Sequence, residues 1–559
     1  MKNDYDAIVV GSGISGGWAA KELTERGLTV LMVERGPAVE HRVDYKNEMK
    51  SPWEMPFKGF NNPEMLAADY AVQSKGTNFD EWSMHHFVKD SDHPYQTTLE
   101  KPFQWRRGYQ LGGRSLTWGR QCYRWSDIDF SANAKDGYGT DWPVRYADLK
   151  PWYDHVESFI GVNGTKEELI QLPDGIFQPH MPLSAIEQLL ADRIASSYDD
   201  RRLIPGRSAN LTLPKEGRAP CQYRYICHRG CSFGAYFSTQ SSTLPAARKT
   251  GRLTLLTDTI VEKVNYDPTA KKVSGISCIN AITGKREQFT SKIVFLNASA
   301  FNSVGILLRS QNDTFPNGLA NSSGTLGKYI MDHATTLSVA ASIDELNDRS
   351  YFGNRPSNFI IPRFRNINTA SEQFLRGYSY QGVGFRANWK RGAHEAGTGE
   401  KLKNKLSKQG EWRLLMVAFA ESLPVASNRI RLADKKDKWG LPLLDISLKH
   451  GDNEHKLLKD AAQQARAMLG LTKSEILASF DEPENAGSAV HEMGGARMGS
   501  DARTSVVNKW NQTHDIPNLF ITDGAAMSSS ANQNPSLTYM AFTARAAAYA
   551  ANKVKNGQL

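Results

Sequence analysis

Three of the five cysteines lie close together in the segment CQYRYICHRGCSFG, at Cys221, Cys227 and Cys231. Their spacing, C-x5-C-x3-C, differs from the paired C-x2-C of most zinc sites, and a fourth ligand would have to come from His228. Thiolates are also the usual protein ligands of iron–sulfur clusters. The residues alone leave three interpretations open: a three-iron, four-sulfide cluster, a zinc site, or free buried thiols.

A glycine-rich turn near the N-terminus could hold the phosphates of a dinucleotide. Gly11, Gly13 and Gly16 form G-x-G-x-x-G between an apolar run and a helical pattern, and Glu34 ends the next apolar run. Such glycines let the backbone approach a pyrophosphate at a helix N-terminus, and the acidic residue can bind ribose hydroxyls. The alternative is that the glycines serve only close packing. The pattern predicts a dinucleotide site without distinguishing FAD from NAD.

Hydrophobic periodicity indicates the elements that must position these residues. We expect residues 5–36 to fold as strand, turn, helix and strand, and residues 37–100 to cross the surface with little regular structure. Alternating residues predict strands over 253–299, and the mixed pattern of 331–450 predicts a separate antiparallel sheet that faces the substrate. Amphipathic or alanine-rich patterns predict helices at 453–470 and from 535 to about 553.

The composition is that of a large globular enzyme, with 559 residues, of which 40% are hydrophobic and 23% charged. The net charge of +9 is spread thinly, so we expect no nucleic-acid partner. No apolar run approaches about 18 residues, and the stretch MKNDYDAIVV lacks the apolar core of a signal peptide. We therefore expect no membrane span and no export signal of its own. Cys122 and Cys278 are expected to be buried thiols.

Several motifs together resemble those of the GMC (glucose–methanol–choline) family of flavin oxidoreductases. They are the N-terminal glycine turn, GGRSLTWG at 112–119, VHEMGGARMG at 490–499, IPNLFITDGAAM at 516–527 and NPSLTYMAFTARAA at 534–547. The resemblance extends over nearly the whole chain, from about residue 4 to residue 553. It implies an α/β fold with a Rossmann-like FAD-binding domain and a substrate domain built on a largely antiparallel sheet.

The resemblance also implies a division of the chain and a set of cofactor contacts. A substrate-binding domain would span 331–489, a cluster-bearing insertion 131–249, and a discontinuous FAD-binding domain 1–36, 101–130, 250–330 and 490–559. FAD contacts are expected at Gly11, Gly13, Gly16, Glu34, Gly113, Ser115, Thr117, Val261, Asp523 and Thr538. In related pyranose oxidases, a histidine at the position of Thr117 bonds covalently to the flavin. Because threonine stands there in this chain, we expect non-covalent FAD.

By motif position, the resemblance assigns the active-site pair of the family to His491 and Asn534. Oxidation of an alcohol removes a hydroxyl proton, for which a neutral imidazole is a suitable base, while a second polar side chain fixes the substrate oxygen. Asn534 also has a structural interpretation, because it precedes Pro535 and could begin the following helix as its N-cap. We expect His333 and His514 to be structural.

The cysteine spacing is similar to that of bacterial FAD-dependent glucose, fructose and gluconate dehydrogenases and of glucoside 3-dehydrogenase, which hold a [3Fe–4S] cluster beside the flavin. The resemblance therefore favours such a cluster at Cys221, Cys227 and Cys231, with Arg224 and Arg229 offsetting its charge. The match departs at the third cysteine, where CSFG replaces a common Cys-Pro. A one-electron cluster would connect a two-electron flavin to a one-electron acceptor.

The resemblance implies a dehydrogenase that oxidises a sugar or glycoside hydroxyl, with C3 of glucosides favoured over C1, C2 or C5. Three alternatives remain open: a pyranose oxidase that uses oxygen, a cyanohydrin-cleaving enzyme that keeps FAD as structure, and a zinc-stabilised binding module. Related dehydrogenases function in the periplasm, where a small partner subunit carries the export signal and a cytochrome accepts electrons. We expect the same escorted export and partners here, with a cytoplasmic location as the alternative.

Overall fold

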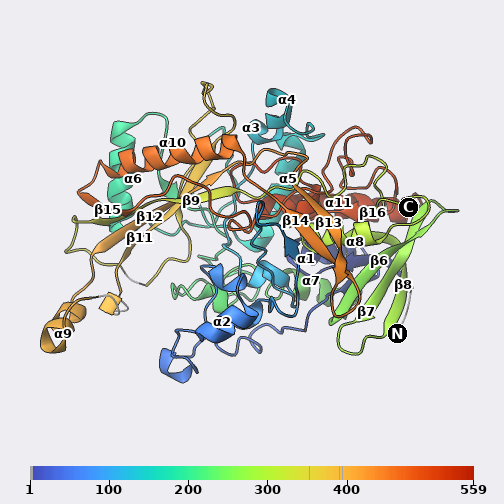
Figure 1. Ribbon diagram of the computed structural model, residues 1–559, viewed down its shortest axis with the longest axis horizontal. Helices are drawn as coiled ribbons and strands as arrows, with labels where there is room; N and C mark the ends of the chain where they lie inside the picture. Colours follow the sequence, from blue (N-terminus) through green and yellow to red (C-terminus); the bar gives the residue numbers. More distant parts are fainter. Residues whose placement is uncertain (1–3, 352, 389–390, 393–394) are drawn as a thin grey trace.

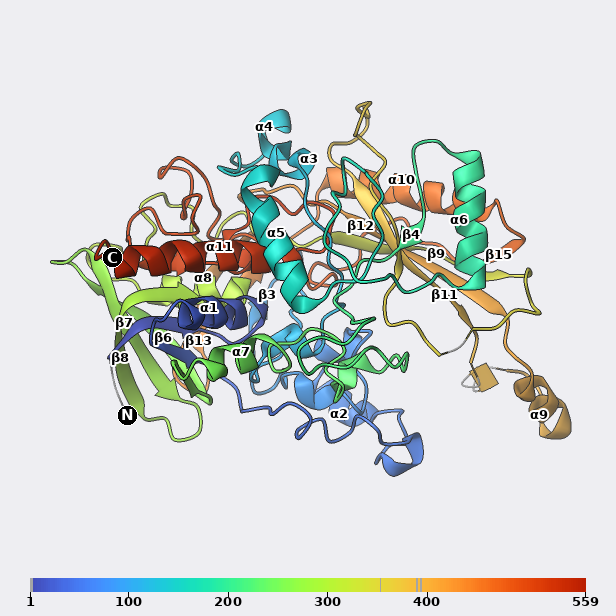
Figure 2. The same cartoon turned by 180° about the vertical axis from the view of Figure 1, so that it is seen from behind.

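The computed structural model describes residues 4–351, 353–388, 391–392 and 395–559, so the first three residues of the segment 1–36 lie outside the described part. The molecule is elongated, with a mostly parallel sheet at one end and an antiparallel sheet at the other (Figure 1). Both ends of the described chain lie beside the parallel sheet (Figure 2). This arrangement confirms the α/β fold with two sheets of different kind.

The parallel sheet is built on the N-terminal unit that the sequence predicts. β1 (Asp4–Val10) is followed by the glycine turn, α1 (Ile14–Glu25) and β2 (Val30–Val33). The parallel strands of this sheet lie in the order β5 (Leu253–Leu256), β2, β1 and β8 (Arg286–Leu296), and β16 (Leu519–Ile521) also pairs with β8. Its central strands are continuous apolar runs because both faces are buried.

Alternate residues of β1 pack into two different cores. Val9 packs on the side of α1, α7 (Thr243–Lys249) and α11 (Ser536–Lys555), whereas Val10 packs on the side of α8 (Ala300–Arg309). This alternation follows from the two-residue period of a strand. The carboxyl ends of the strands are left facing the centre of the molecule, where the glycine turn begins.

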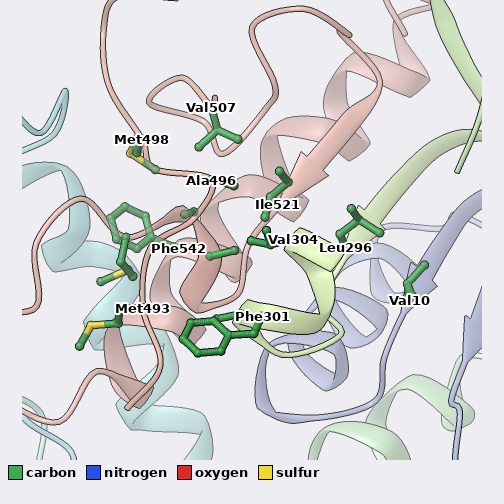
Figure 3. Close-up of a cluster of buried hydrophobic side chains, with 14 of the residues drawn as sticks. Val10, Leu296, Phe301, Val304, Met493, Ala496, Met498, Val507, Ile521 and Phe542 are labelled. Carbon is green, nitrogen blue, oxygen red and sulfur yellow. The ribbon is translucent and has the colours of Figure 1, made fainter. Parts of the chain in front are cut away.

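A buried cluster fixes the loop HEMGGARMG against these strand ends. Figure 3 shows strand, α8 and loop side chains of this cluster together, among them Val10, Leu296, Ile521, Phe301, Val304, Met493, Ala496 and Met498. The loop is also joined to the segment after β16 by backbone hydrogen bonds, from Gly494 N to Gly524 O (2.8 Å) and from Ala496 N to Ala525 O (2.9 Å). The packing therefore holds the residues just after His491 rigidly.

Two antiparallel strands of the same sheet and one smaller sheet complete this body. β6 (Thr259–Asp267) and β7 (Lys272–Asn280) continue from β8 as antiparallel strands. β13 (Arg429–Lys436), β14 (Pro442–Ser447) and β3 (Gln96–Thr97) form a three-stranded sheet that contacts α8. Residues 429–447 therefore lie with the parallel-sheet body, although they fall within the predicted substrate domain 331–489.

The second large sheet is antiparallel, as predicted for part of 331–450. Its strands lie in the order β15 (Ser474–Ala478), β9 (Ala334–Ile343), β12 (Trp412–Ala420), β11 (Tyr378–Arg386), β10 (Phe359–Ile361) and β4 (Ile204–Pro205). Two helices, α6 (Ala185–Ser197) and α10 (Asp452–Leu469), cover one face. In β12, buried and half-buried residues alternate, so the second face remains free to line a site.

The remaining elements are short. The segment 37–100 is largely irregular, as predicted, with η1 (Pro52–Glu54), α2 (Pro63–Asp69), η2 (Gln73–Lys75), η3 (Met84–His86) and β3. Elsewhere lie η4 (Gly113–Leu116), α3 (Asp127–Phe130), α4 (Ala132–Asp136), α5 (Tyr146–Ile160), η5 (Cys227–Arg229), α9 (Gly399–Ser407) and η7 (Gly524–Ala526). Within the described ranges, no helix has the combined length and apolarity that crossing a bilayer requires.

The predicted insertion 131–249 does not form a unit of its own. α5 packs against α11 of the parallel-sheet body, and α7 packs against α1. In contrast, α6 and β4 belong to the antiparallel sheet. The apolar faces of these helices thus have different partners, which corrects the predicted boundary: the segment is divided between the two bodies.

Candidate active site

A cavity of about 700 Å³ lies between the two bodies. The glycine turn lines one part of it through Gly11 and Gly13, and His491 and Asn534 line another. Further predicted cofactor residues on its surface are Glu34, Gly113, Ser115, Thr117, Val261 and Asp523. The fold therefore brings residues that are far apart in the sequence to one continuous space.

The three glycines of the turn have different physical roles. Gly11 has a φ of +93°, and a Cβ there would lie 2.3 Å from the carbonyl oxygen of Asn297. A Cβ on Gly16 would lie 1.9 Å from the carbonyl oxygen of Gly11, so Gly16 permits helix and turn to pack closely. Gly13 has no atom within 4 Å of an added Cβ and faces the cavity. It leaves the N-terminus of α1 open to a phosphate.

Polar atoms around the cavity also fit a bound dinucleotide. Glu34 is buried and accepts hydrogen bonds from Ser12 Oγ (2.5 Å) and from the backbone N–H of Gly36 (3.1 Å). Burial raises the pKa of the Glu34 carboxyl. Asn297 Oδ1 and Arg106 Nε line the same cavity and have no hydrogen-bond partner within the described residues. Buried polar atoms of this kind usually have a partner, and a bound cofactor would supply one.

Two of the predicted cofactor residues do not line the cavity. Gly16 lies behind the turn, where it packs against Gly11. Thr538 is fully buried, and its hydroxyl lies 2.8 Å from the hydroxyl of Tyr153, between α11 and α5. The predicted contact of Thr538 with a cofactor is therefore corrected to a helix–helix contact, because the residue occupies the face of α11 that meets α5.

His491 is the centre of a hydrogen-bonded network. Its Nδ1 lies 2.8 Å from Nδ1 of His333, and its Nε2 lies 3.1 Å from Nδ2 of Asn534. Nε2 of His333 lies 3.1 Å and 2.9 Å from the backbone carbonyl oxygens of Ser530 and Ala531. Both carbonyls can only accept, so His333 carries its proton on Nε2.

The protonation of His491 follows from this network. Burial lowers the pKa of His333 to about 4, so its Nδ1 is a free acceptor at neutral pH. His491 must then donate from Nδ1 to His333, which leaves Nε2 as an unprotonated nitrogen. Burial, followed by the charges of His333 and Arg114, lowers the pKa of His491 well below its usual value. The imidazole therefore presents a basic nitrogen beside Asn534, at the wall of the cavity.

Sequence reasoning missed the role of the segment YIMDH, where His333 was expected to be only structural. Asp332 accepts backbone hydrogen bonds from His491 (2.9 Å), Gly487 (2.8 Å) and Ala489 (3.3 Å). Burial, and then the charge of Glu492, raise the pKa of Asp332 to about 7. One short segment thus fixes both the loop of His491 and the orientation of its ring. The motif was visible in the sequence, but its distance of 158 residues from His491 concealed the contact.

Asn534 is not the N-cap of the final helix. α11 begins at Ser536, with Pro535 at the N-cap position and no side-chain cap. The amide of Asn534 instead contacts His491 and accepts a hydrogen bond from Gln381 Nε2 at 2.5 Å. Asn534 is therefore a residue of the candidate site and not the N-cap of the helix. His514 lies away from it, with Nε2 at 3.0 Å from Ser505 Oγ.

The antiparallel sheet supplies another wall of the cavity that the glycine turn lines. Thr335 of β9, Gln381 of β11, and Val417 and Phe419 of β12 line the cavity with their free sheet face. The Phe419 ring lies 5.9 Å from the ring of His491. These residues combine an apolar ring with hydrogen-bonding groups, and no sequence motif singled them out.

The three clustered cysteines line one small cavity of about 20 Å³. No group of three ligand side chains within the described residues is close enough to hold a single metal ion. His228 is bonded to Asp80, with Nε2 and Oδ2 2.9 Å apart, which argues against it as a zinc ligand. Arg224 lies 3.9 Å from the sulfur of Cys231, whereas Arg229 stacks on Trp82. Cys122 and Cys278 are free and buried, as expected.

The geometry fits a dinucleotide-dependent oxidoreductase whose cavity is lined by His491 and Asn534. The family models for GMC oxidoreductases match residues 5–335 and 424–543. The chain therefore belongs to the GMC oxidoreductase family. It is an FAD-dependent enzyme that acts on the CH–OH group of alcohols or sugars, and the residues at the glycine turn fit that cofactor.

The chain is similar over its full length to several enzymes. It is 28% identical to a 2-methyl-1,2-propanediol dehydrogenase of Mycolicibacterium austroafricanum, covering 97% of this chain and 94% of the relative. It is 27% identical to the fructose dehydrogenase large subunit of Gluconobacter japonicus, covering 99% and 98%. The structure of a formate oxidase of Aspergillus oryzae superposes with a TM-score of 0.63 at 13% identity, covering 99% and 98%, which confirms the fold.

Proposed function

We propose that the protein is a dehydrogenase that oxidises a hydroxyl of a sugar or glycoside, with C3 of glucosides favoured, and passes the electrons to an external acceptor. The observation that carries the proposal is the position of His491 Nε2, which lies 3.1 Å from Asn534 Nδ2 on the cavity wall while Nδ1 lies 2.8 Å from His333 Nδ1. When bound, non-covalent FAD supplies the hydride acceptor.

Different residues of the chain would accept the proton, hold the reacting oxygen and bind the rest of the substrate. His491 Nε2 takes the proton of the reacting hydroxyl, and Asn534 holds its oxygen through the amide N–H. Phe419 offers an apolar ring to the face of a sugar, while Asn358 offers hydrogen bonds to its other hydroxyls. The similarity to a fructose dehydrogenase large subunit supports a carbohydrate substrate.

The test is to expose the FAD-loaded enzyme to methyl α-D-glucoside without oxygen. We expect the flavin absorbance to bleach, and NMR of the reoxidised mixture to place the new carbonyl at C3. A carbonyl at C1, C2 or C5 would show that the enzyme oxidises that carbon and not C3. Rapid reoxidation by oxygen alone would favour an oxidase. The variant His491→Asn should bleach about 10²- to 10⁴-fold more slowly, because the proton acceptor is lost.

We also propose that Cys221, Cys227 and Cys231 hold a [3Fe–4S] cluster, which would supply a one-electron acceptor. All three line one cavity, which is shaped by residues that include Tyr225. Tyr225 and Cys227 also line the large cavity, so the two sites adjoin. A cluster spaces its thiolates more widely than a single ion does, which agrees with the absence of a single-ion site within the described residues.

Iron analysis of anaerobically purified protein tests the cluster. We expect about three iron atoms per chain and their loss in a variant that carries Cys221→Ser, Cys227→Ser and Cys231→Ser. The variant should still be bleached by sugar at the normal rate, because none of the three cysteines contacts His491 or Asn534. Zinc in place of iron, or the absence of both metals, would overturn this part of the proposal.

A protein partner is supported by an exposed apolar segment beside the cysteines. Between residues 43 and 60, Met49, Trp53 and Phe60 are 71%, 72% and 79% exposed. Met49 Sδ lies 2.8 Å from a guanidinium nitrogen of Arg224, so the segment borders the cysteine loop. Large exposed apolar groups usually mark contact surfaces. We propose a small partner subunit and a cytochrome acceptor in the periplasm, reached by escorted export; the relative named as a large subunit supports such partnering.

A further inference from the structure

The side chain of Gln381 extends from the antiparallel sheet to Asn534, which contacts His491. In β11, Tyr378 and Tyr380 point to the helix-covered face, where their hydroxyls bond to α10 at Asp460 Oδ2 (2.5 Å) and to the carbonyl of Ala461 (2.6 Å). Because side chains alternate along a strand, Gln381 points to the opposite face and lines the cavity. There its Nε2 lies 2.5 Å from Asn534 Oδ1. Both amides are more than nine-tenths buried.

The amide of Asn534 could face His491 in either of two ways. With Nδ2 toward the ring, it donates to an unprotonated Nε2. With Oδ1 toward the ring, it needs a proton on Nε2, and His491 could then no longer accept one from substrate. The two orientations have nearly the same shape, so packing alone does not select between them.

The neighbours of Asn534 impose a single direction. At one end of the network, two backbone carbonyls fix the proton of His333, as described above. His333 therefore accepts the proton of Nδ1 of His491 and leaves Nε2 of His491 as an acceptor. Asn534 must direct Nδ2 at that nitrogen and Oδ1 away from it. Gln381 Nε2, which lies 2.5 Å from Oδ1, donates to this oxygen and stabilises the same orientation.

We propose that Gln381 is a positioning residue that orients the Asn534 amide and thereby keeps Nε2 of His491 unprotonated, so that a substrate hydroxyl that takes the place of the Asn534 N–H can give its proton to Nε2. The inference rests on the proposed function, because it assigns the base to His491. It adds a residue from the substrate-facing sheet, so the sheet that binds the substrate also sets the protonation of the base.

The substitutions Gln381→Glu and Gln381→Met separate this role from simple packing. Both keep the length of the side chain. A glutamate carboxylate only accepts, so we expect Asn534 to turn Nδ2 toward it and present Oδ1 to His491, which favours a proton on Nε2. Methionine removes the donor but offers no strong acceptor toward which the Asn534 amide would rotate. We expect the rate of flavin bleaching by sugar at pH 7 to fall about 100-fold with glutamate and less than about 10-fold with methionine.

A second readout does not depend on turnover. Nitrogen-15 NMR of histidine-labelled protein reports which ring nitrogen carries the proton, and the signals of His491 are assigned by their loss in His491→Asn. We expect an unprotonated Nε2 in the normal protein and in Gln381→Met, and a protonated Nε2 in Gln381→Glu. Ser379→Ala is the control, because Ser379 points to the same face of β11 and bonds to the carbonyl of Asn532, not to Asn534.

The pH dependence needs all charged neighbours of His491 to be considered. These are His333, the Arg114–Glu492 ion pair and Asp332, which are the same in both variants, whereas Gln381→Glu adds a carboxylate whose charge also raises the pKa of His491. A rise in the apparent pKa of bleaching with glutamate, and no rise with methionine, is the expected result. Equal losses in both variants with Nε2 still unprotonated would overturn the role of Gln381. If His491→Asn bleached at the normal rate, the proposed function would fail instead, whatever the NMR result.

Discussion

At the scale of single residues, the proposed chemistry depends on His333, which contacts Nδ1 of His491 and not Nε2, the proposed base. His333 accepts from Nδ1 of His491 and so decides which nitrogen of that ring remains free. The same segment supplies Asp332, which holds the backbone on which His491 sits. Base and support are therefore separate residues, and a change in the support should alter the base without removing it.

Replacing His333 tests this separation. His333→Phe keeps a ring at the position but removes the acceptor, so the proton of His491 is free to move between its two nitrogens. We expect flavin bleaching by sugar to slow by about 10- to 100-fold, a smaller loss than for His491→Asn. His514→Gln is the control, because His514 lies outside the cavity lining. Equal losses for His333→Phe and His491→Asn, with FAD still bound, would contradict a supporting role.

The pH profile of the normal enzyme gives a second residue-scale prediction. The pKa of His491 is lowered by burial first, then by His333 and Arg114, so its folded-state pKa lies below the usual 6.5. The base is thus unprotonated as pH falls through 6.5, and it gains a proton only at lower pH. Asp332, whose pKa is about 7, also titrates in this range, so the profile is measured in Asp332→Asn as well. We expect the rate of flavin bleaching in that variant to stay level between pH 8 and about 6.5 and to fall below that range. A decline centred at or above pH 6.5 in the variant would show that burial does not control the base.

At the scale of elements, the glycine turn offers a matched pair of variants. In Gly13→Ala the new Cβ meets no protein atom, but it projects toward the cavity, whereas in Gly16→Ala it meets the carbonyl of Gly11. We expect Gly13→Ala to keep the thermal stability of the FAD-free protein and to weaken FAD binding about tenfold or more. Gly16→Ala should lower the melting temperature of the FAD-free protein by several degrees. Differential scanning calorimetry and flavin fluorescence titration measure the two effects. Loss of stability in both would contradict the distinction.

The sequence predicted the helices and strands far better than it predicted which of them pack together. The strand–turn–helix–strand unit, the helix near 453–470 and the final helix were confirmed because each depends on local periodicity. The division of 131–249 between two bodies was not predicted, since a helical pattern shows which face is buried but not what covers it. For the same reason the contact of Thr538 with Tyr153 was missed. Motifs located His491 and Asn534, whereas Gln381 carries no motif and is placed only by strand register.

At the scale of the whole molecule, the two cavities adjoin each other. The large cavity is suited to a small substrate, and the small cysteine cavity adjoins it through Tyr225 and Cys227. The exposed segment 43–60 borders the cysteine loop, where Glu48 accepts a hydrogen bond from the backbone N–H of Ser232 at 3.1 Å. Substrate entry and electron exit would then use different surfaces of the chain. Substitutions in segment 43–60 should therefore leave the oxidation of the sugar unchanged.

The double variant Trp53→Ser and Phe60→Ser tests this separation with two acceptors of different size. Ferricyanide needs no extended contact surface, whereas cytochrome c must dock. We expect ferricyanide reduction with sugar to remain unchanged and cytochrome c reduction to fall about tenfold, since two exposed aromatic contacts are lost. Ile282→Ser is the matched control, because Ile282 is equally exposed, at 79%, but lies in the turn between β7 and β8 and not in segment 43–60. If the double variant slowed both acceptors alike, the segment would be needed for the structure of the enzyme. If it slowed neither, electrons would leave by another surface, and the exposed aromatics would have to bind a partner that takes no electrons.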